Sequence, residues 1–136
     1  EAYARGNDAT FKVMLDLDKE KRKVLERLGC NPIDIFVAGG FLGDPIKSFY
    51  EYSESKDRAI SPTSVRSRYI TEDVSQGLIL LESIAKRIGV AVPITTSLIN
   101  ISSVALAEDF RENGRTIQRL GCEKYIEELC ETRYGY

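Results

Sequence analysis

The first regular pattern along the chain is helical. After Asn7, apolar residues recur at helical spacing as far as Leu28, and Gly29 follows them (Val13, Leu17, Val24 and Leu28). Residues at this spacing share one face of an α-helix, and a glycine readily adopts the left-handed conformation that ends one, so the pattern predicts an amphipathic helix over residues 7–28. The charged run DKEKRK within it pairs Asp18 with Arg22 four residues later, which is typical of a solvated helix face.

Two dipeptides that end in proline mark the next segments. Asn31-Pro32 and Asp44-Pro45 each place a capping side chain before a proline at the first helical position, and each predicts a short helix, the first ending at Gly39-Gly40. The intervening run IDIFVAGGFLGD superficially resembles a dinucleotide loop. However, its glycines do not form GxGxxG and no βαβ unit surrounds them, so a helix stop and a turn are the better interpretation. Residues 53–62 are polar and rich in helix breakers, which predicts a surface loop.

A further helix is predicted from Thr71 to Gly89. Thr71 is the expected cap, Glu72 and Asp73 lie in the first turn, and an apolar stripe runs to the end of the helix (Leu78, Leu81, Ala85 and Ile88). Gly77 weakens the helix locally and leaves a break there as an alternative.

The segment that begins at Pro93 carries no charge for fourteen residues, ITTSLINISSVALA. It predicts a helix with an apolar face opposite small polar residues (Ile94, Leu98, Ile101 and Ala105). We expect this helix to be buried on most sides, either at the centre of the domain or in a subunit interface.

The end of the chain predicts two more helical pieces. Asn113-Gly114 ends the preceding region, Thr116 caps a short turn to Leu120, and CEKYIEELCE forms a last helix in which Tyr125 and Leu129 share a face. At least five helices and no convincing β alternation predict an all-α, compact multi-helix fold. Residues 1–136 are interpreted as a single domain.

Composition narrows the function. The net charge of −2 disfavours nucleic acid and anionic membranes as partners, and the absence of His removes Ser/His/Asp and Cys/His arrangements. The three cysteines form no CxxC pair and are odd in number, which is typical of a reducing compartment and predicts no metal site. No apolar run is long enough to span a bilayer and no targeting segment is visible, so a cytoplasmic location is expected. The chain starts without Met, as a domain of a longer protein would.

Opposite charges concentrate around the predicted cap at Thr71: Arg66, Arg68, Glu72 and Asp73. One interpretation is a surface salt bridge with a capping turn. The other is chemical, because an Asp in a first helical turn is held ionised by the free N–H groups, and an Arg five residues earlier offers a bidentate fork for a carboxylate. Such a pair can orient an imidazole and grip an acid substrate.

The sequences RYITEDVSQGL (68–78), LLESIAKRIGVAVPITTSLI and DFRENGRTIQRLG (109–121) resemble the helical second domain of octopine and nopaline type opine dehydrogenases. That family has an R-Y-L-x-E-D-V-P-Y-G-L signature, a helix, a G-V-x-x-P turn, a second helix and a D-Y-x-x-x-G-R-T-L-x-x-L-G ending. The resemblance covers residues 11–120. Ser75 stands where the signature usually has Pro, and Gln76 where it often has an aromatic residue.

The resemblance implies a fold like the helical domain of 6-phosphogluconate dehydrogenase-type oxidoreductases. It also implies reduction of the imine formed between an amino acid and a 2-oxo acid, with NAD or NADP held by an N-terminal dinucleotide-binding domain that this chain lacks. In the family a His just before the helical domain is the acid/base group, a signature Asp orients it, and a signature Arg contacts the oxo acid. By motif position these are Asp73 and Arg68. Arg115 and Thr116 match the ending motif but are assigned to no chemistry.

Two alternatives stay open: the helical domain of another NAD(P)-dependent reductase, of the ketopantoate reductase or hydroxyacid dehydrogenase type, and a non-catalytic helical interaction module. In either enzymatic case the isolated chain is expected to be inactive and to hold no cofactor. The surface meant to face the dinucleotide-binding domain is uncovered, so self-association at high concentration is also expected.

Overall fold

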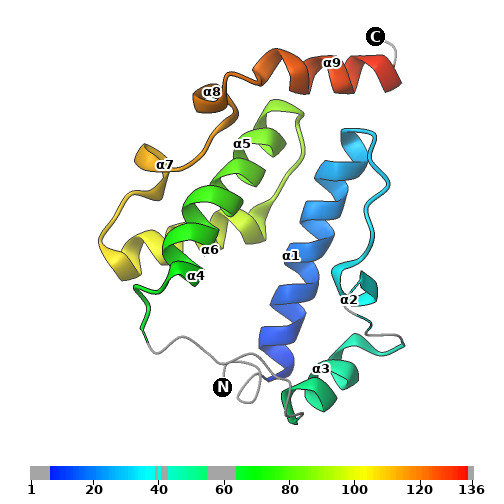
Figure 1. The fold of residues 1–136 in the computed structure, drawn as a ribbon, viewed down its shortest axis with the longest axis vertical. Coiled ribbons are helices and arrows are strands. Elements are labelled where there is room, and N and C mark those ends of the chain that lie inside the picture. The colour runs from blue at the N-terminus through cyan, green and yellow to red at the C-terminus, as the bar shows by residue number, and fades with distance from the viewer. Residues whose placement is uncertain (1–6, 39, 41–42, 55–63, 135–136) are drawn as a thin grey trace.

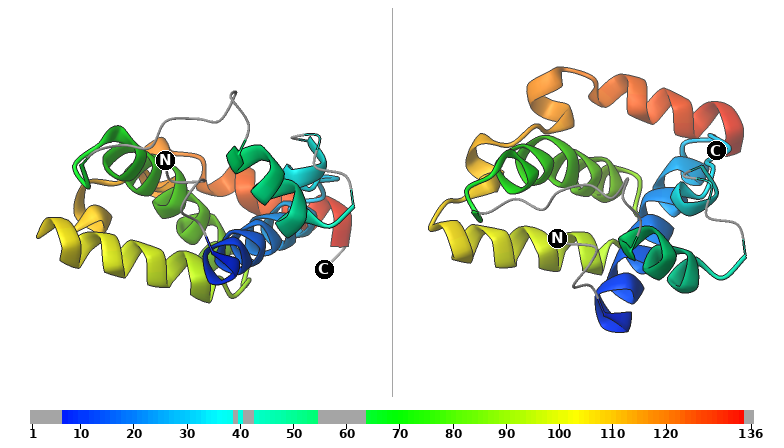
Figure 2. Two further views of the ribbon diagram at one scale, coloured as in Figure 1. Left: turned by 90° about the horizontal axis from the view of Figure 1, so that it is seen from below. Right: turned by 60° about the horizontal axis from the view of Figure 1, so that its bottom comes forward.

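The computed structural model describes residues 7–38, 40, 43–54 and 64–134, and within these ranges every regular element is a helix (Figure 1). The prediction of an all-α fold is confirmed. The long helix α1 (Asp8–Arg27) lies beside α5 (Ile79–Arg87), and α6 (Pro93–Leu106) packs against both of them (Figure 2). The last helix, α9 (Glu123–Tyr134), crosses the ends of α1 and α5. Within the described ranges, no helix has the length and apolar character needed to cross a bilayer.

Helix α1 follows the prediction at both ends. The Asn7 side chain accepts a hydrogen bond from the Thr10 amide at 3.0 Å, and Gly29 has φ 81° just after the helix. The prediction of a solvated charged face is wrong for two residues, because Asp18 and Glu20 are each only 5% exposed. Asp18 pairs with Arg22 at 3.0 Å, as predicted.

Of the two short helices, α2 (Ile35–Ala38) and α3 (Pro45–Glu54), only α3 begins at the proline that was predicted to open it. Asn31-Pro32 does not open α2, which starts at Ile35 because the Asp34 carbonyl accepts the first helical hydrogen bond, from Ala38. Asp44 does cap α3 and accepts from the Ile46 amide at 3.0 Å. Of the predicted loop 53–62, residues 53–54 are helical, and the remainder lies outside the described residues, as does Gly39.

The helix predicted from Thr71 begins earlier and changes its type. It starts as α4 (Arg68–Glu72), widens into a π-helical segment over Asp73–Leu78, and continues as α5. Gly77 lies inside the widened segment, so the weakness predicted there is a change of helical pitch and not a break. Val74 and Ile79 are both buried, although residues five apart point about 140° apart in a regular α-helix. The π segment is what brings them to one face.

Helix α6 begins at Pro93 as predicted, but it buries a different face from the one expected. Thr95, Ile99 and Leu106 are buried, whereas Ile101 is 65% and Val104 84% exposed. Helix α6 is therefore not buried on most sides at the centre of the described structure, and burial in a subunit interface stays a prediction. The outer face of α6 is apolar and uncovered.

The remaining short helices are α7 (Phe110–Asn113) and α8 (Ile117–Leu120). Thr116 caps α8 as predicted and accepts from the Arg119 amide at 3.2 Å. In α9 the buried residue is Ile126, while Tyr125 is 62% exposed and only Leu129 of the predicted pair packs on the core.

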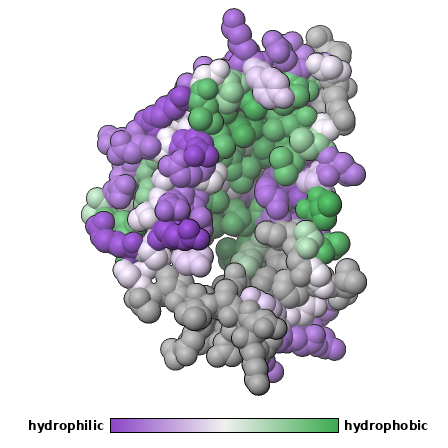
Figure 3. Space-filling view, in the orientation of Figure 1, coloured by the Kyte–Doolittle hydropathy of each residue, from purple (hydrophilic) through white to green (hydrophobic). Residues whose placement is uncertain are grey.

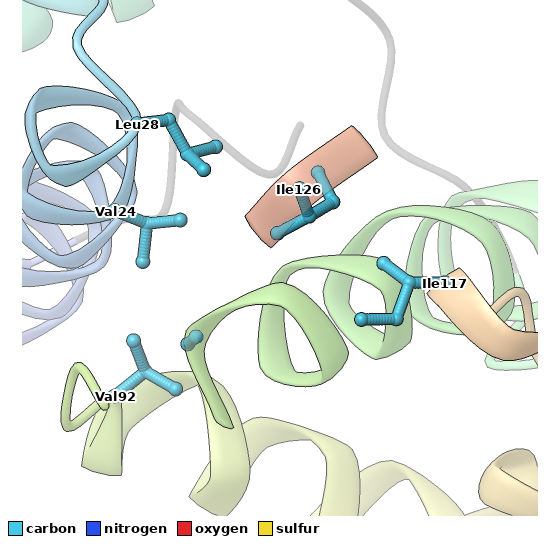
Figure 4. Packing of buried hydrophobic residues seen from close by; sticks show 6 residues of the cluster. Val24, Leu28, Val92, Ile117 and Ile126 are labelled. Atoms are coloured by element: carbon cyan, nitrogen blue, oxygen red, sulfur yellow. The ribbon is translucent and has the colours of Figure 1, made fainter. Parts of the chain in front are cut away.

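Two clusters hold the helices together. The first core cluster joins α1, α5, α8 and α9 and the turn before α6 (Val24, Leu28, Ala85, Val92, Ile117 and Ile126; Figure 4). The second core cluster joins the π segment, α5, α6 and α7 (Val74, Ile79, Ile99, Leu106 and Phe110). The partly buried hydrophobics around the first cluster come mainly from α5 and α9. Apolar side chains gather on the surface between α5 and α1, below α9 (Figure 3).

Candidate functional site

Arg68 and Asp73 lie one backbone turn apart at the start of the π segment. The Asp73 N–H group donates to the Arg68 carbonyl, five residues earlier, which is the hydrogen-bonding pattern of a π turn. In a regular α-helix these residues would point about 140° apart. The widened turn instead closes at the fifth residue, which reduces the angle between them, and both residues are exposed.

The predicted cap and its electrostatic consequence are wrong. Ser67, not Thr71, is the N-cap residue, and the Thr71 hydroxyl donates to the Ser67 carbonyl at 3.2 Å. Glu72 and Asp73 therefore lie beyond the first turn, and the Asp73 amide is already used within the helix. Free N–H groups of a helix N-terminus do not stabilise the Asp73 carboxylate, which faces solvent.

The charged residues around this turn have separate contacts. The Arg66 guanidinium donates to the Leu106 carbonyl at 3.1 Å and so ties the turn to the end of α6. The Arg68 guanidinium lies 5.7 Å from the centre of the Tyr69 ring, within cation–π range. Among the described residues no ion pair joins these arginines to Glu72 or Asp73. The surface salt bridge of the alternative interpretation is therefore absent from this part of the chain.

A second charged cluster was missed by the sequence reasoning. Arg111 at α7 grips Glu82 of α5 with two hydrogen bonds, each 2.7 Å long, and donates a third to the Asn100 side chain at 2.8 Å. Thr96 of α6 donates to the same Glu82 carboxylate at 2.8 Å. Residues 29 positions apart in the sequence give no local pattern that could have announced this pair.

The Glu82–Arg111 pair lines a groove of about 800 Å³ between α5, α6 and the α7–α8 segment, together with Lys86, Thr116 and Gln118. The Arg111 hydrogen bonds hold the pKa of the Glu82 carboxyl below its usual value, and the carboxylate in turn raises the pKa of Arg111. Both oxygens of Glu82 are already occupied by protein donors. The cluster therefore connects three helices, and both Glu82 oxygens are engaged in holding them together.

The glycines that superficially resemble a dinucleotide loop lie in a helical setting. Gly40 and Gly43 follow the four-residue helix α2, not a strand, and within the described ranges no strand leads into a glycine turn and a helix. A pyrophosphate site of the βαβ type requires that unit.

The sequence of residues 2–106 matches the family model described as NAD/NADP octopine/nopaline dehydrogenase, alpha-helical domain. The match includes Arg68 and Asp73 and ends before the motif at 109–121. An opine dehydrogenase of Arthrobacter sp. (strain 1C) is 35% identical over 60 residues, which are 44% of this chain and 17% of that protein.

Two further relatives align over a longer stretch. Vitopine synthase of Allorhizobium ampelinum is 31% identical over 113 residues, which are 80% of this chain and 31% of that protein. Protein ocs of Agrobacterium tumefaciens is 31% identical over 112 residues, or 79% and 31%. The aligned region thus spans a third or less of each relative. The chain belongs to the octopine/nopaline dehydrogenase family and corresponds to its alpha-helical domain.

Proposed function

We propose that this chain is the substrate-binding and catalytic helical domain of a longer opine dehydrogenase-like oxidoreductase, which condenses an amino acid with a 2-oxo acid reductively at the expense of NAD(P)H. The observation that supports the proposal most directly is the π turn that joins Arg68 to Asp73 at the family's signature, with both residues exposed. Family membership favours this function over the ketopantoate reductase and hydroxyacid dehydrogenase types.

Asp73 is proposed to orient an acid/base imidazole. The chain contains no His, so the imidazole has to come from another part of the enzyme. An exposed carboxylate with no described side-chain partner is free to accept a hydrogen bond from one imidazole N–H, which fixes the tautomer and stabilises the charged form. The other ring nitrogen then exchanges a proton with the substrate.

Arg68 is proposed to bind the carboxylate of the oxo acid. Its guanidinium is exposed and contacts only the Tyr69 ring among the interactions described for it, so its donors can form a bidentate pair with a carboxylate. Arg66 is a poorer candidate because it already donates to the Leu106 carbonyl.

The cofactor, NAD or NADP, is proposed to be bound by an N-terminal dinucleotide-binding domain of the same protein. It supplies the hydride when bound. The apolar surface between α5 and α1 is a suitable contact for such a domain, because contiguous exposed apolar area marks interaction sites (Figure 3).

Steady-state kinetics of the full-length protein test both assignments. Asp73→Asn keeps the shape but removes an acceptor, and in a protease triad the equivalent change lowers turnover about ten-thousand-fold. We expect kcat to fall by that order while the KM for NAD(P)H stays unchanged. Arg68→Ala removes a charge-assisted contact worth about 1.5–3 kcal/mol, so the KM for the oxo acid should rise about ten- to a hundred-and-fifty-fold.

Glu108→Gln is the matched control, since it neutralises an exposed carboxylate outside the signature. It should leave all constants near the wild-type values. Near-wild-type turnover of Asp73→Asn would refute the catalytic role. Reduction of a 2-oxo acid with no amino acid present would favour the hydroxyacid dehydrogenase type, and a full-length protein without any reductase activity would favour the interaction module.

A further inference from the structure

We propose that Gly114 and Arg115 are positioning residues for the signature: they brace the π segment and so fix the placement of Asp73 relative to Arg68. This inference rests on the proposed function, because it concerns the same two residues. It adds a role for the ending motif, which contains Gly114 and Arg115 and to which no chemistry has been assigned.

The π segment needs an external partner to persist. A π turn is a rare insertion into an α-helix and leaves backbone groups without the usual helical partners. Here the Ser75 carbonyl, in the middle of the segment, accepts a hydrogen bond from the Arg115 amide at 2.7 Å. The donor lies 40 positions later in the sequence, on a separate loop. If the π segment became a regular α-helix, the Ser75 carbonyl would move and the hydrogen bond from Arg115 would be lost.

Gly114 brings the loop close enough for this bond. A Cβ atom at Gly114 would lie 2.4 Å from the Phe110 carbonyl oxygen and 2.8 Å from two side-chain carbons of Ile79. Only a glycine allows the backbone to approach the first residue of α5 so closely. The contact is also buried, because Gly114, Phe110 and Ile79 are all shielded from solvent.

A second contact fixes the same loop just after Arg115. Thr116 caps α8, and the next amide, that of Ile117, donates to the Ser83 hydroxyl of α5 at 3.1 Å. The loop is therefore attached to the π segment through Arg115 and to α5 through Ile117. Its position relative to the helix is determined on both sides of the Arg115–Ser75 bond.

The consequence for the site follows from helix geometry. Converting the π segment to a regular helix would shift the register by one residue, about 100° around the axis. The angle between Arg68 and Asp73 around the helix axis would then change by that amount. A small misplacement of a catalytic group, on the order of 1 Å, costs about a hundred-fold in rate.

Gly114→Ala in the full-length enzyme tests the brace. We expect kcat/KM for the oxo acid to fall about a hundred-fold with the KM for NAD(P)H unchanged, and amide hydrogen exchange to accelerate in the peptide that contains Arg115. The decisive measurement is a double-mutant cycle with Asp73→Asn. If Gly114 acts through the placement of Asp73, Asp73→Asn should cost far less in the Gly114→Ala background than in the wild type.

A control variant separates positioning from loss of stability. Val24→Ala removes buried methyl groups from the α1 side of the first core cluster, and it should lower stability while its effect adds to that of Asp73→Asn.

The outcomes are distinguishable. Additive effects of Gly114→Ala and Asp73→Asn, or a folded Gly114→Ala enzyme with normal kcat/KM, would overturn the positioning role while leaving the proposed function intact. A wild-type protein that performs no reductive condensation would overturn the proposed function, and the positioning role with it. Unchanged exchange at Arg115 in Gly114→Ala would overturn the brace itself.

Discussion

At the scale of single residues, a buried carboxylate determines where α6 begins. Val92, at the N-cap position of α6, has no capping side chain. Glu20 of α1 takes over this role: its carboxylate accepts from the Ile94 amide at 2.7 Å, the Thr95 amide at 2.9 Å and the Thr95 hydroxyl at 2.8 Å. A carboxylate here satisfies free N–H groups and also favours the positive end of the helix dipole.

Glu20→Gln should therefore destabilise the fold. The amide keeps one acceptor oxygen but turns an NH2 group toward a buried donor, so we expect a loss of about 2 kcal/mol and a fall in Tm of roughly 5–10 °C. Asp16→Asn, the same chemical change at an exposed position of α1, should cost less than about 0.5 kcal/mol. Thermal unfolding of the three proteins compares them, and equal Tm values would contradict the capping role of Glu20.

Sequence reasoning placed Glu20 in a solvated charge run because its neighbours are charged. Five of the six residues of DKEKRK do have at least a partly exposed or ion-paired side chain, but the partners of Glu20 lie 74 and 75 positions away. Local spacing predicts a helix and its ends, and it predicted Asn7, Gly29 and Thr116 correctly. It contains no information about a partner on another helix.

At the scale of elements, the Glu82–Arg111 pair fastens α7 to α5 and gives stability a pH dependence. The pKa of Glu82 in the folded protein is lowered by Arg111 from the usual 4.5. A carboxyl with a lowered folded pKa stabilises the fold fully above its unfolded pKa, and this contribution is lost as the pH falls through the lowered value. The pair is partly exposed, so its worth near neutral pH is at most about 1 kcal/mol.

Arg111→Gln should consequently lower the free energy of unfolding at pH 7 and the difference from wild type should shrink below pH 4.5. Part of this difference in free energy of unfolding should remain at low pH, because Arg111 also donates a hydrogen bond to Asn100. Urea unfolding between pH 7 and pH 3 measures the difference. Lys47→Gln, which removes an exposed ion pair with Glu51, is the control and should show almost no difference at any pH. If the difference in free energy of unfolding between wild type and Arg111→Gln stays constant down to pH 3, the pair contributes by packing alone.

The errors of prediction at this scale have one physical origin. The stripe expected to be buried on α6 is more apolar than the face that packs, yet Thr95 and Ile99 are buried because Glu20 and the second core cluster lie on their side. The π segment could not be predicted from the sequence either. Residues 73–78 show only a weak helix position at Gly77, and the donor that bonds the Ser75 carbonyl is the distant Arg115 amide. Arg68 and Asp73 were found through the family signature, but we propose that their relative placement depends on that distant bond.

At the scale of the whole molecule, the described residues form a helical unit with uncovered apolar surface. The surface between α5 and α1 is exposed (Figure 3). The outer face of α6 is exposed as well, through Ile101 and Val104. Self-association at high concentration stays a prediction, which light scattering tests; a strict monomer at millimolar protein would contradict it. The chain also spans a third or less of its relatives, so an isolated chain offers only part of the proposed enzyme.

The isolated chain should therefore neither bind NAD(P)H nor oxidise it. Dinucleotide binding requires backbone N–H groups at a glycine turn between a strand and a helix, and within the described residues the glycines after α2 have no strand before them. Calorimetry with NADH and NADPH should give only heats of dilution for residues 1–136, whereas the full-length protein should bind one of the two at micromolar concentration. Saturable binding to the isolated chain would mean that the helical domain carries cofactor contacts of its own. The proposal that the helical domain binds the substrate and a separate domain binds the cofactor would then be wrong.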